Sequence, residues 1–185
     1  MHAWKQLESF INVSCDSKVI GARNYGFTSP RDFQGHGTFI ASVAAGRKVC
    51  GASYLGLAGG VARGGAPASR IAAYKACGGD GCWSTDVLMA FDDAIADGVD
   101  VILTPLGMPE PVPFLFDPIA IGSLYAARSG ILTCVAGGNQ GPYPRTVTNN
   151  APWQLTAAAS SIDRRIVTTL ALGNGETCMV ITNNQ

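Results

Sequence analysis

Between residues 70 and 136, short apolar segments alternate with amphipathic segments, and this alternation constrains the fold more than any other feature. Residues 70–76, 99–104 and 131–136 are apolar and of strand length. Pro105 ends the second of them, because proline cannot donate to a sheet ladder. Strand, helix, strand, helix and strand at these lengths predict a parallel sheet with right-handed crossovers and helices on its faces.

Both predicted helices carry start and stop residues. Ser84 stands at the N-cap position of the first helix, which Gly98 closes. Asp117 followed by proline opens the second helix, which Gly130 ends. The apolar residues expected to be buried in the first helix are Val87, Leu88, Phe91, Ala94 and Ile95. Those expected to be buried in the second are Ile119, Ala120, Ile121, Leu124 and Tyr125.

Composition excludes several classes of partner. The 185 residues are 47% hydrophobic, which is enough for one domain with a substantial core. The formal net charge is zero and the longest basic cluster is the pair at 164–165, so we expect neither nucleic acid nor an anionic membrane as a partner. No apolar run has the length of a membrane span, and the N-terminus has no apolar stretch of signal-peptide length.

Six cysteines favour an oxidising compartment. Cys77 and Cys82 flank a flexible glycine-rich loop, so we expect them to form a disulfide. Zinc is disfavoured at this pair, because no second cysteine or histidine pair lies nearby to complete four ligands. The sequon at Asn12 also favours secretion. Nucleotide binding by the glycine-rich segment 56–60 is disfavoured, because it lacks G-x-G-x-x-G spacing.

Two motifs point to catalysis at the carboxyl ends of the strands, where parallel sheets bind ligands. His36 stands between two glycines before an alanine-rich helical stretch, where one ring nitrogen can take a proton while a carboxylate holds the other. Asn139 follows the third strand within G-G-N-Q-G-P, where its amide can donate to a developing oxyanion. Taken singly, His36 also fits a surface residue capping a helix, and Asn139 fits a glycine-rich turn.

Together the two motifs resemble the subtilase family, especially its plant branch, in which G-H-G-T-H-x-A-S is followed by A-G-N-x-G-P. Similarity extends over residues 12–175 and includes the segments 18–23, 62–67, 91–100, 117–122 and 143–147. The resemblance implies a subtilisin-like three-layer α/β fold with a mostly parallel sheet, truncated at both ends. Residues 1–185 would then form a partial subtilisin-like peptidase domain, with no cofactor or metal.

The resemblance also assigns roles to residues. It makes His36 the general base and Asn139 the oxyanion donor. Leu106 and Gly107 become part of the edge that pairs with an extended polypeptide substrate, and Gly138 becomes a further substrate-binding residue. Plant subtilases are secreted, which implies an extracellular setting for the complete relative.

Four positions depart from the usual family pattern. Phe39 and Ile40 stand where histidine and threonine are usual, although neither position is catalytic. Pro105 replaces the usual serine of the substrate edge, and Gly138 replaces the alanine before the asparagine. We expect altered packing near the histidine and a change in how the edge pairs with substrate.

The family's D-[ST]-G aspartate motif and G-T-S-M-A serine motif are both absent from this sequence. Asp16-Ser17-Lys18 matches the first only superficially, and Asp32 fits a loop or capping carboxylate. Ser42 and the serines at 160–161 fit structural positions. By family we expect a serine endopeptidase, with this chain inactive by itself. The alternative is a non-catalytic pseudoprotease that binds a protein or peptide.

Overall fold

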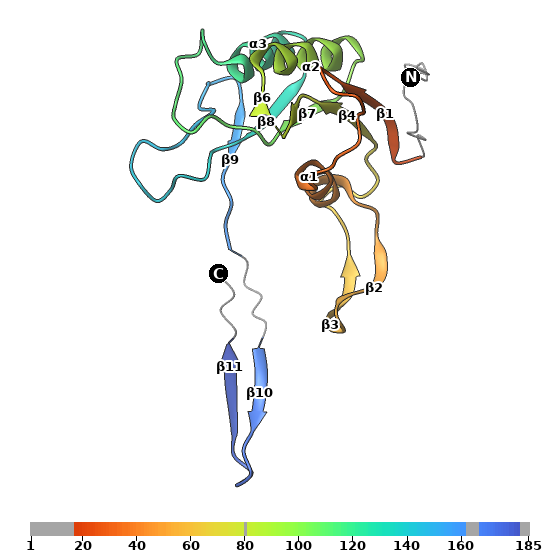
Figure 1. Cartoon of the computed structure of the whole chain (residues 1–185), viewed down its shortest axis with the longest axis vertical. Helices are drawn as coiled ribbons and strands as arrows, with labels where there is room; N and C mark the ends of the chain where they lie inside the picture. Colours follow the sequence, from red (N-terminus) through yellow and green to blue (C-terminus); the bar gives the residue numbers. More distant parts are fainter. Residues whose placement is uncertain (1–16, 80, 162–166, 182–185) are drawn as a thin grey trace. The chain divides into compact units, whose positions relative to one another are not determined.

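The computed structural model describes residues 17–79, 81–161 and 167–181 (Figure 1). The chain divides into two compact units. The first consists of Met1–Lys48 and Arg63–Ala158, and the second of Val49–Ala62 and Ala159–Gln185. Within the described residues, no helix is long and apolar enough to cross a bilayer.

The longer strands described in the first unit form parallel sheets. β7 (Val101–Thr104), β8 (Leu132–Ala136) and β9 (Leu155–Ala157) pair in that order, all parallel, as the sequence predicted for the first two. β4 (Ile71–Lys75) instead pairs in parallel with β1 (Val19–Asn24). The sequence predicted one sheet containing residues 70–76, 99–104 and 131–136. For the described residues this prediction is wrong, because β4 forms its hydrogen bonds with β1 and none with β7.

Three helices belong to the same unit: α1 (His36–Ala45), α2 (Ser84–Ala96) and α3 (Pro118–Arg128). Ser84 is the first helical residue of α2 rather than its cap. The cap is Trp83, which has an extended backbone and whose carbonyl accepts from the N–H of Val87 at 3.1 Å. Gly98, just beyond the end of α2, has a φ of 69° and confirms the predicted glycine stop.

The predicted start of α3 is confirmed. Asp117 caps it by accepting a 2.8 Å hydrogen bond from the N–H of Ile119, and proline occupies the first helical position, where no N–H is needed. Gly130, beyond the other end, has a φ of 78° as a glycine stop requires.

A core lies between these helices and the strands. Its buried members are Tyr25, Ala76, Val87, Phe91, Ile119 and Val135. Val87, Phe91 and Ala94 are buried as expected from the first predicted helix. α3 differs from expectation, because Leu124 and Tyr125 are 38% and 53% exposed.

The buried face of α3 consists instead of mostly small residues. They are Ile119, Ala120, Gly122, Ser123 and Ala126. A Cβ atom added at Gly122 would lie 2.4 Å from ring atoms of Phe91, so the glycine lets α2 and α3 approach closely (Figure 1). Because α2 and α3 lie close together, α3 buries the face that carries its small residues. Hydrophobicity alone did not predict this.

A polar cluster joins β1 and β4 to the carboxyl end of α2. Arg23 donates to both carboxylate oxygens of Asp97, at 3.1 and 2.8 Å. Tyr74 donates to Asp97 at 2.8 Å, and Tyr25 donates to Asp93 at 2.7 Å. Burial and these hydrogen bonds raise the pKa of both tyrosines, so both hydroxyls remain donors at neutral pH. The cluster therefore anchors α2 to the two-stranded sheet.

The predicted disulfide is confirmed. Cys77 and Cys82 pair across the short strands β5 (Cys77–Gly78) and β6 (Gly81–Cys82), with their sulfurs 2.07 Å apart. Both thiols are therefore committed to the disulfide and supply no thiolate to a metal ion.

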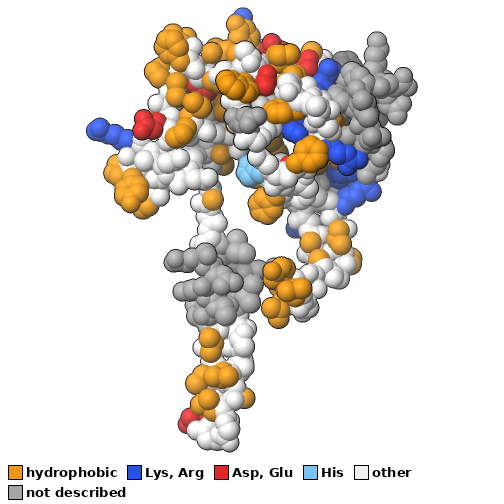
Figure 2. Space-filling view, viewed as in Figure 1, with side chains coloured by type: hydrophobic (Ala, Val, Ile, Leu, Met, Phe, Trp, Pro, Cys, Tyr) orange, Lys and Arg blue, Asp and Glu red, His pale blue; other side chains and the backbone are white. Residues whose placement is uncertain are grey.

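Two antiparallel hairpins make up the described part of the second unit. β2 (Val49–Tyr54) pairs with β3 (Leu57–Ala62), and β10 (Val167–Ala171) pairs with β11 (Thr177–Ile181). Both expose hydrophobic side chains, which Figure 2 colours orange. The glycine-rich segment 56–60 lies at the turn and in β3, so it does not connect a strand to a helix as a dinucleotide site requires.

Replacing Gly122 with alanine is expected to destabilise the fold. Overpacking against Phe91 costs about 1–3 kcal/mol, which exceeds the roughly 1 kcal/mol that alanine gains over glycine in a helix. Urea unfolding followed by circular dichroism measures the difference. Gly21→Ala is the control, because a Cβ atom there meets nothing within 4 Å. The close-packing argument fails if Gly122→Ala is as stable as Gly21→Ala, or if adding Phe91→Leu does not recover stability.

Candidate active site at the carboxyl ends of β7 and β8

Two predicted site segments leave neighbouring strands at the same edge. The ladder between β7 and β8 ends with Thr104 opposite Val135. Beyond it, the side-chain nitrogen of Asn149 donates to the carbonyl of Leu106 at 2.7 Å and to that of Ala136 at 2.8 Å. One buried amide therefore joins the start of the predicted substrate edge to the start of the predicted oxyanion loop.

Thr148 fills the space between these segments. Its N–H donates to the carbonyl of Gly137 at 3.0 Å. Cβ atoms added at Gly107 and Gly138 would lie 3.2 and 3.0 Å from the Thr148 hydroxyl oxygen, and Gly138 has a φ of 94°. Glycine at both positions leaves room for Thr148, and the left-handed backbone gives Gly138 a second reason to be glycine.

Asn139 lies at the exposed tip of the loop after β8. Its backbone N–H donates to the side-chain oxygen of Gln140 at 2.9 Å. The side-chain amide of Asn139 makes no hydrogen bond within the described part of the chain, and it is exposed beside the glycine pair at 137–138. This placement suits an amide that donates to a ligand.

His36 is the first residue of α1, as the sequence predicted. Gly35 before it has a φ of 86°, a left-handed conformation that favours glycine. The imidazole is exposed. No hydrogen bond described in the structure joins His36 to Asn139, so the shared catalytic site that the two motifs indicate stays a prediction.

Asp32 fixes the start of α1, which confirms its interpretation as a capping carboxylate. One carboxylate oxygen accepts from the N–H groups of Gln34 and Gly35 at 3.0 and 2.8 Å. The other accepts from the N–H and the hydroxyl of Thr38, both at 2.8 Å. The hydrogen bonds from Thr38 and Gly35 lower the pKa of Asp32 to about 2.

The remaining candidates play other parts. Asp16 lies outside the described residues. Ser42 donates to the carbonyl of Thr38 at 2.7 Å within α1, as expected for a structural serine. Among the described residues, no group of three histidine, cysteine, aspartate or glutamate side chains could hold a metal ion.

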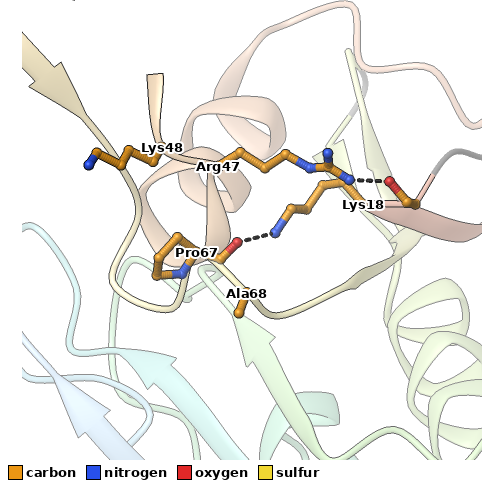
Figure 3. Close-up of a pocket in the computed structure, with 6 residues that line it drawn as sticks. Lys18, Arg47, Lys48, Pro67 and Ala68 are labelled. Atoms are coloured by element: carbon orange, nitrogen blue, oxygen red, sulfur yellow. Dashed lines mark hydrogen bonds between the residues drawn. The ribbon is translucent and has the colours of Figure 1, made fainter. Parts of the chain in front are cut away.

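A basic pocket of about 390 Å³ lies elsewhere in the first unit (Figure 3). The ammonium group of Lys18 donates to the carbonyls of Pro67, at 2.8 Å, and Ser69, and Arg47 donates to the hydroxyl of Ser17. The pocket is lined by Ser17, Lys18, Arg47, Lys48, Pro67 and Ala68. It contains none of the predicted site residues.

Sequence reasoning missed Thr148 and Asn149. Neither belongs to a local motif, because the partners of the Asn149 amide lie 43 and 13 residues away in the chain. The only local clue was the residue type. Apart from glycine, asparagine is among the residues that best tolerate a left-handed backbone, and Asn149 has a φ of 50°.

Comparison with known proteins places this fold and these motifs among the serine proteases with parallel α/β sheets. The model of the subtilase family matches residues 9–183. The chain therefore belongs to the subtilase family.

Plant relatives and solved structures agree with this membership. The chain is 52% identical over 166 residues to the subtilisin-like protease SBT4.8 of Arabidopsis thaliana and 54% identical to SBT4.10 of the same plant. Each alignment covers 90% of this chain but 23% and 24% of the relative, so the chain spans about a quarter of their length. An S41 psychrophilic protease and Sphericase match with TM-scores of 0.54 and 0.52 at 26% and 25% identity. Both alignments cover 83% of this chain and 46% of the other. The expected subtilisin-like α/β fold is confirmed.

Replacing Asp32 with asparagine is expected to destabilise the start of α1. Asparagine keeps one side-chain oxygen as an acceptor but removes the negative charge, and an exposed charge at a helix N-terminus stabilises the helix by about 0.3–1 kcal/mol at neutral pH. Because the folded-state pKa is about 2 and the unfolded value is about 4, this stabilisation is complete above pH 4. It disappears as the pH falls through 2.

Urea unfolding of the chain and of Asp32→Asn between pH 7 and pH 2.5 measures this difference. Asp100→Asn, at an exposed loop carboxylate, is the control. A stability gap that stays constant over this pH range, or that equals the gap for Asp100→Asn, would contradict the capping role.

Proposed function

We propose that residues 1–185 form part of the peptidase domain of a secreted serine endopeptidase, and that by themselves they bind an extended polypeptide without cleaving it. The observation that carries this proposal is the junction of the Leu106–Gly107 edge with the loop bearing Asn139, at the carboxyl ends of two parallel strands. The Cys77–Cys82 disulfide supports an oxidising, extracellular setting.

In the proposed reaction, His36 is the general base and Asn139 the oxyanion donor. A serine hydroxyl oxygen bonds to the peptide carbonyl carbon while His36 takes its proton. The carbonyl oxygen becomes negative and accepts a hydrogen bond from the Asn139 amide. In subtilisin, a member of this family, removing such a donor costs about 10²–10³ in turnover. His36 then protonates the leaving nitrogen, the carbon–nitrogen bond breaks, and water hydrolyses the remaining ester.

Substrate would bind by strand addition at Leu106 and Gly107. Gly107 is exposed and has no side chain, so its backbone can meet an extended peptide closely. Gly138 lies across the Thr148 side chain from Gly107 and would form the facing wall. Every residue assigned to peptide binding belongs to the described part of this chain.

The chemistry needs two further groups, a serine nucleophile and a carboxylate that orients His36. Neither family motif for them occurs in these 185 residues. Asp32 is a poor substitute for the carboxylate, because both of its oxygens accept hydrogen bonds at the start of α1. In an active protease these groups would come from the rest of the molecule. Without them, the chain acts as a non-catalytic peptide-binding protein.

The purified chain is expected to bind a neutral, fluorescein-labelled peptide of alternating leucine and serine, as measured by fluorescence anisotropy. Gly107→Val should weaken binding about tenfold or more, because its side chain collides with Thr148 and blocks the edge. Gly21→Ala, whose added Cβ atom meets nothing within 4 Å, is the control. Equal affinity of the two variants would refute the binding edge.

The same preparation is expected to hydrolyse neither the peptide nor an ester substrate above the rate of His36→Ala. It should also resist labelling by a serine-directed fluorophosphonate, which reacts only with an activated serine. Release of amino groups and mass spectrometry measure the two outcomes. Labelling of one serine that His36→Ala abolishes would show a nucleophile within this chain.

A further inference from the structure

We propose that Asn149 is the positioning residue of the peptide-binding edge: its side-chain amide sets the spacing between Leu106–Gly107 and the loop bearing Asn139. This inference rests on the proposed function, since it assigns a role within the same binding site. It adds a residue that belongs to neither catalytic motif.

The first argument is where the two hydrogen bonds fall. Leu106 and Ala136 lie beyond Thr104 and Val135, the last residue pair of the β7–β8 ladder, and Ala136 still pairs with Ala157 of β9 on its other side. The side-chain nitrogen of Asn149 donates to the carbonyl of Leu106 at 2.7 Å and to the carbonyl of Ala136 at 2.8 Å. An asparagine side chain has two N–H donors, so it can serve one carbonyl with each. The amide therefore continues the link between the strands where their backbone ladder has stopped.

The second argument is that Asn149 is itself held in place. It is 5% exposed, and its backbone carbonyl accepts a hydrogen bond from the Thr156 hydroxyl in β9. Its neighbour Thr148 donates its N–H to Gly137. Asn149 is thus fixed to β9 and to the loop after β8 before its side chain reaches Leu106. A side chain anchored on two sides can set the position of a third segment.

The third argument concerns residue type. The left-handed backbone of Asn149, with a φ of 50°, is tolerated well by asparagine and glycine among common residues. Glycine would keep this backbone but would leave two partly buried carbonyls without their donor. Aspartate would keep the shape but would turn oxygen atoms toward both carbonyls. These two substitutions therefore separate the backbone requirement from the requirement for the amide.

Gln154 provides a matched control. Its amide donates to the Ser123 hydroxyl at 2.7 Å and to the Ile119 carbonyl at 3.3 Å, and so makes two hydrogen bonds as Asn149 does. Its partners lie in α3 rather than at the carboxyl edge of the sheet. Gln154→Ala should lower stability without moving Gly107 or Gly138.

The experiment compares the full chain with Asn149→Gly, Asn149→Asp and Gln154→Ala. The first readout is the affinity for the neutral, fluorescein-labelled leucine–serine peptide, corrected for the folded fraction. Asn149→Gly should weaken binding about tenfold, because two partly buried hydrogen bonds to the edge are lost. Gln154→Ala should stay within about twofold of the unchanged chain, because its side-chain amide donates to α3 and to neither segment of the edge.

The second readout does not depend on peptide binding. In ¹H–¹⁵N spectra of the free protein, the backbone amide signals of Gly107 and Gly138 should shift in Asn149→Gly and stay unchanged in Gln154→Ala. If the unchanged chain binds no peptide but these signals behave as expected, the proposed function fails and the positioning role stands. If Asn149→Gly moves neither signal, or moves them no more than Gln154→Ala does, the positioning role is overturned.

Asn149→Asp gives a third readout with a pH dependence. The hydrogen-bond partners of Asn149 carry no titratable side chain, so burial beside two carbonyls should raise the pKa of the introduced carboxyl. Below that pKa its O–H can donate to one carbonyl, and the Gly107 signal should move toward its position in the unchanged chain. Above that pKa this donor is lost. A Gly107 signal with the same pH dependence in both proteins would count against a direct contact.

Discussion

The parallel pairing of β7 with β8 is the constraint on which the candidate site depends. Parallel strands direct their carboxyl ends to the same edge, so the segments that follow them must begin side by side. The ladder stops at Thr104 and Val135, and carbonyls beyond that point need another donor or water. The Asn149 amide meets this need for Leu106 and Ala136. The same two hydrogen bonds therefore satisfy backbone carbonyls and fix the spacing of the proposed binding edge.

His36 is positioned by a different interaction. α1 begins at His36 because Asp32 accepts from the N–H groups at its start, and because Gly35 adopts a left-handed backbone. These contacts are local and involve neither β7 nor β8. His36 and Asn139, the proposed general base and oxyanion donor, therefore stand on separately stabilised pieces of structure. A mutation that loosens α1 need not disturb the loop of Asn139, and the reverse also holds.

Sequence reasoning succeeded where the controlling chemistry is local. The proline start of α3, the glycine stops and the Cys77–Cys82 disulfide each depend on residues a few positions apart. It failed where distant residues decide. Tyr125 is exposed because Gly122 turns the small face of α3 toward Phe91, and no periodicity within α3 contains that information. β4 pairs with β1 rather than β7, and Asn149 acts 43 residues from Leu106, so both depend on tertiary structure.

Peptide binding and peptide hydrolysis place different demands on this architecture. Binding by strand addition needs an exposed backbone edge with a fixed spacing to its facing wall, and Leu106, Gly107 and Gly138 with their supports lie within one unit of this chain. Hydrolysis also needs a nucleophile, a base and an orienting carboxylate within hydrogen-bond reach of one another. Those groups gain nothing unless the scissile carbonyl is already held in place. The proposed edge at Leu106 and Gly107 would therefore serve both processes, and binding a peptide there would require none of the catalytic groups.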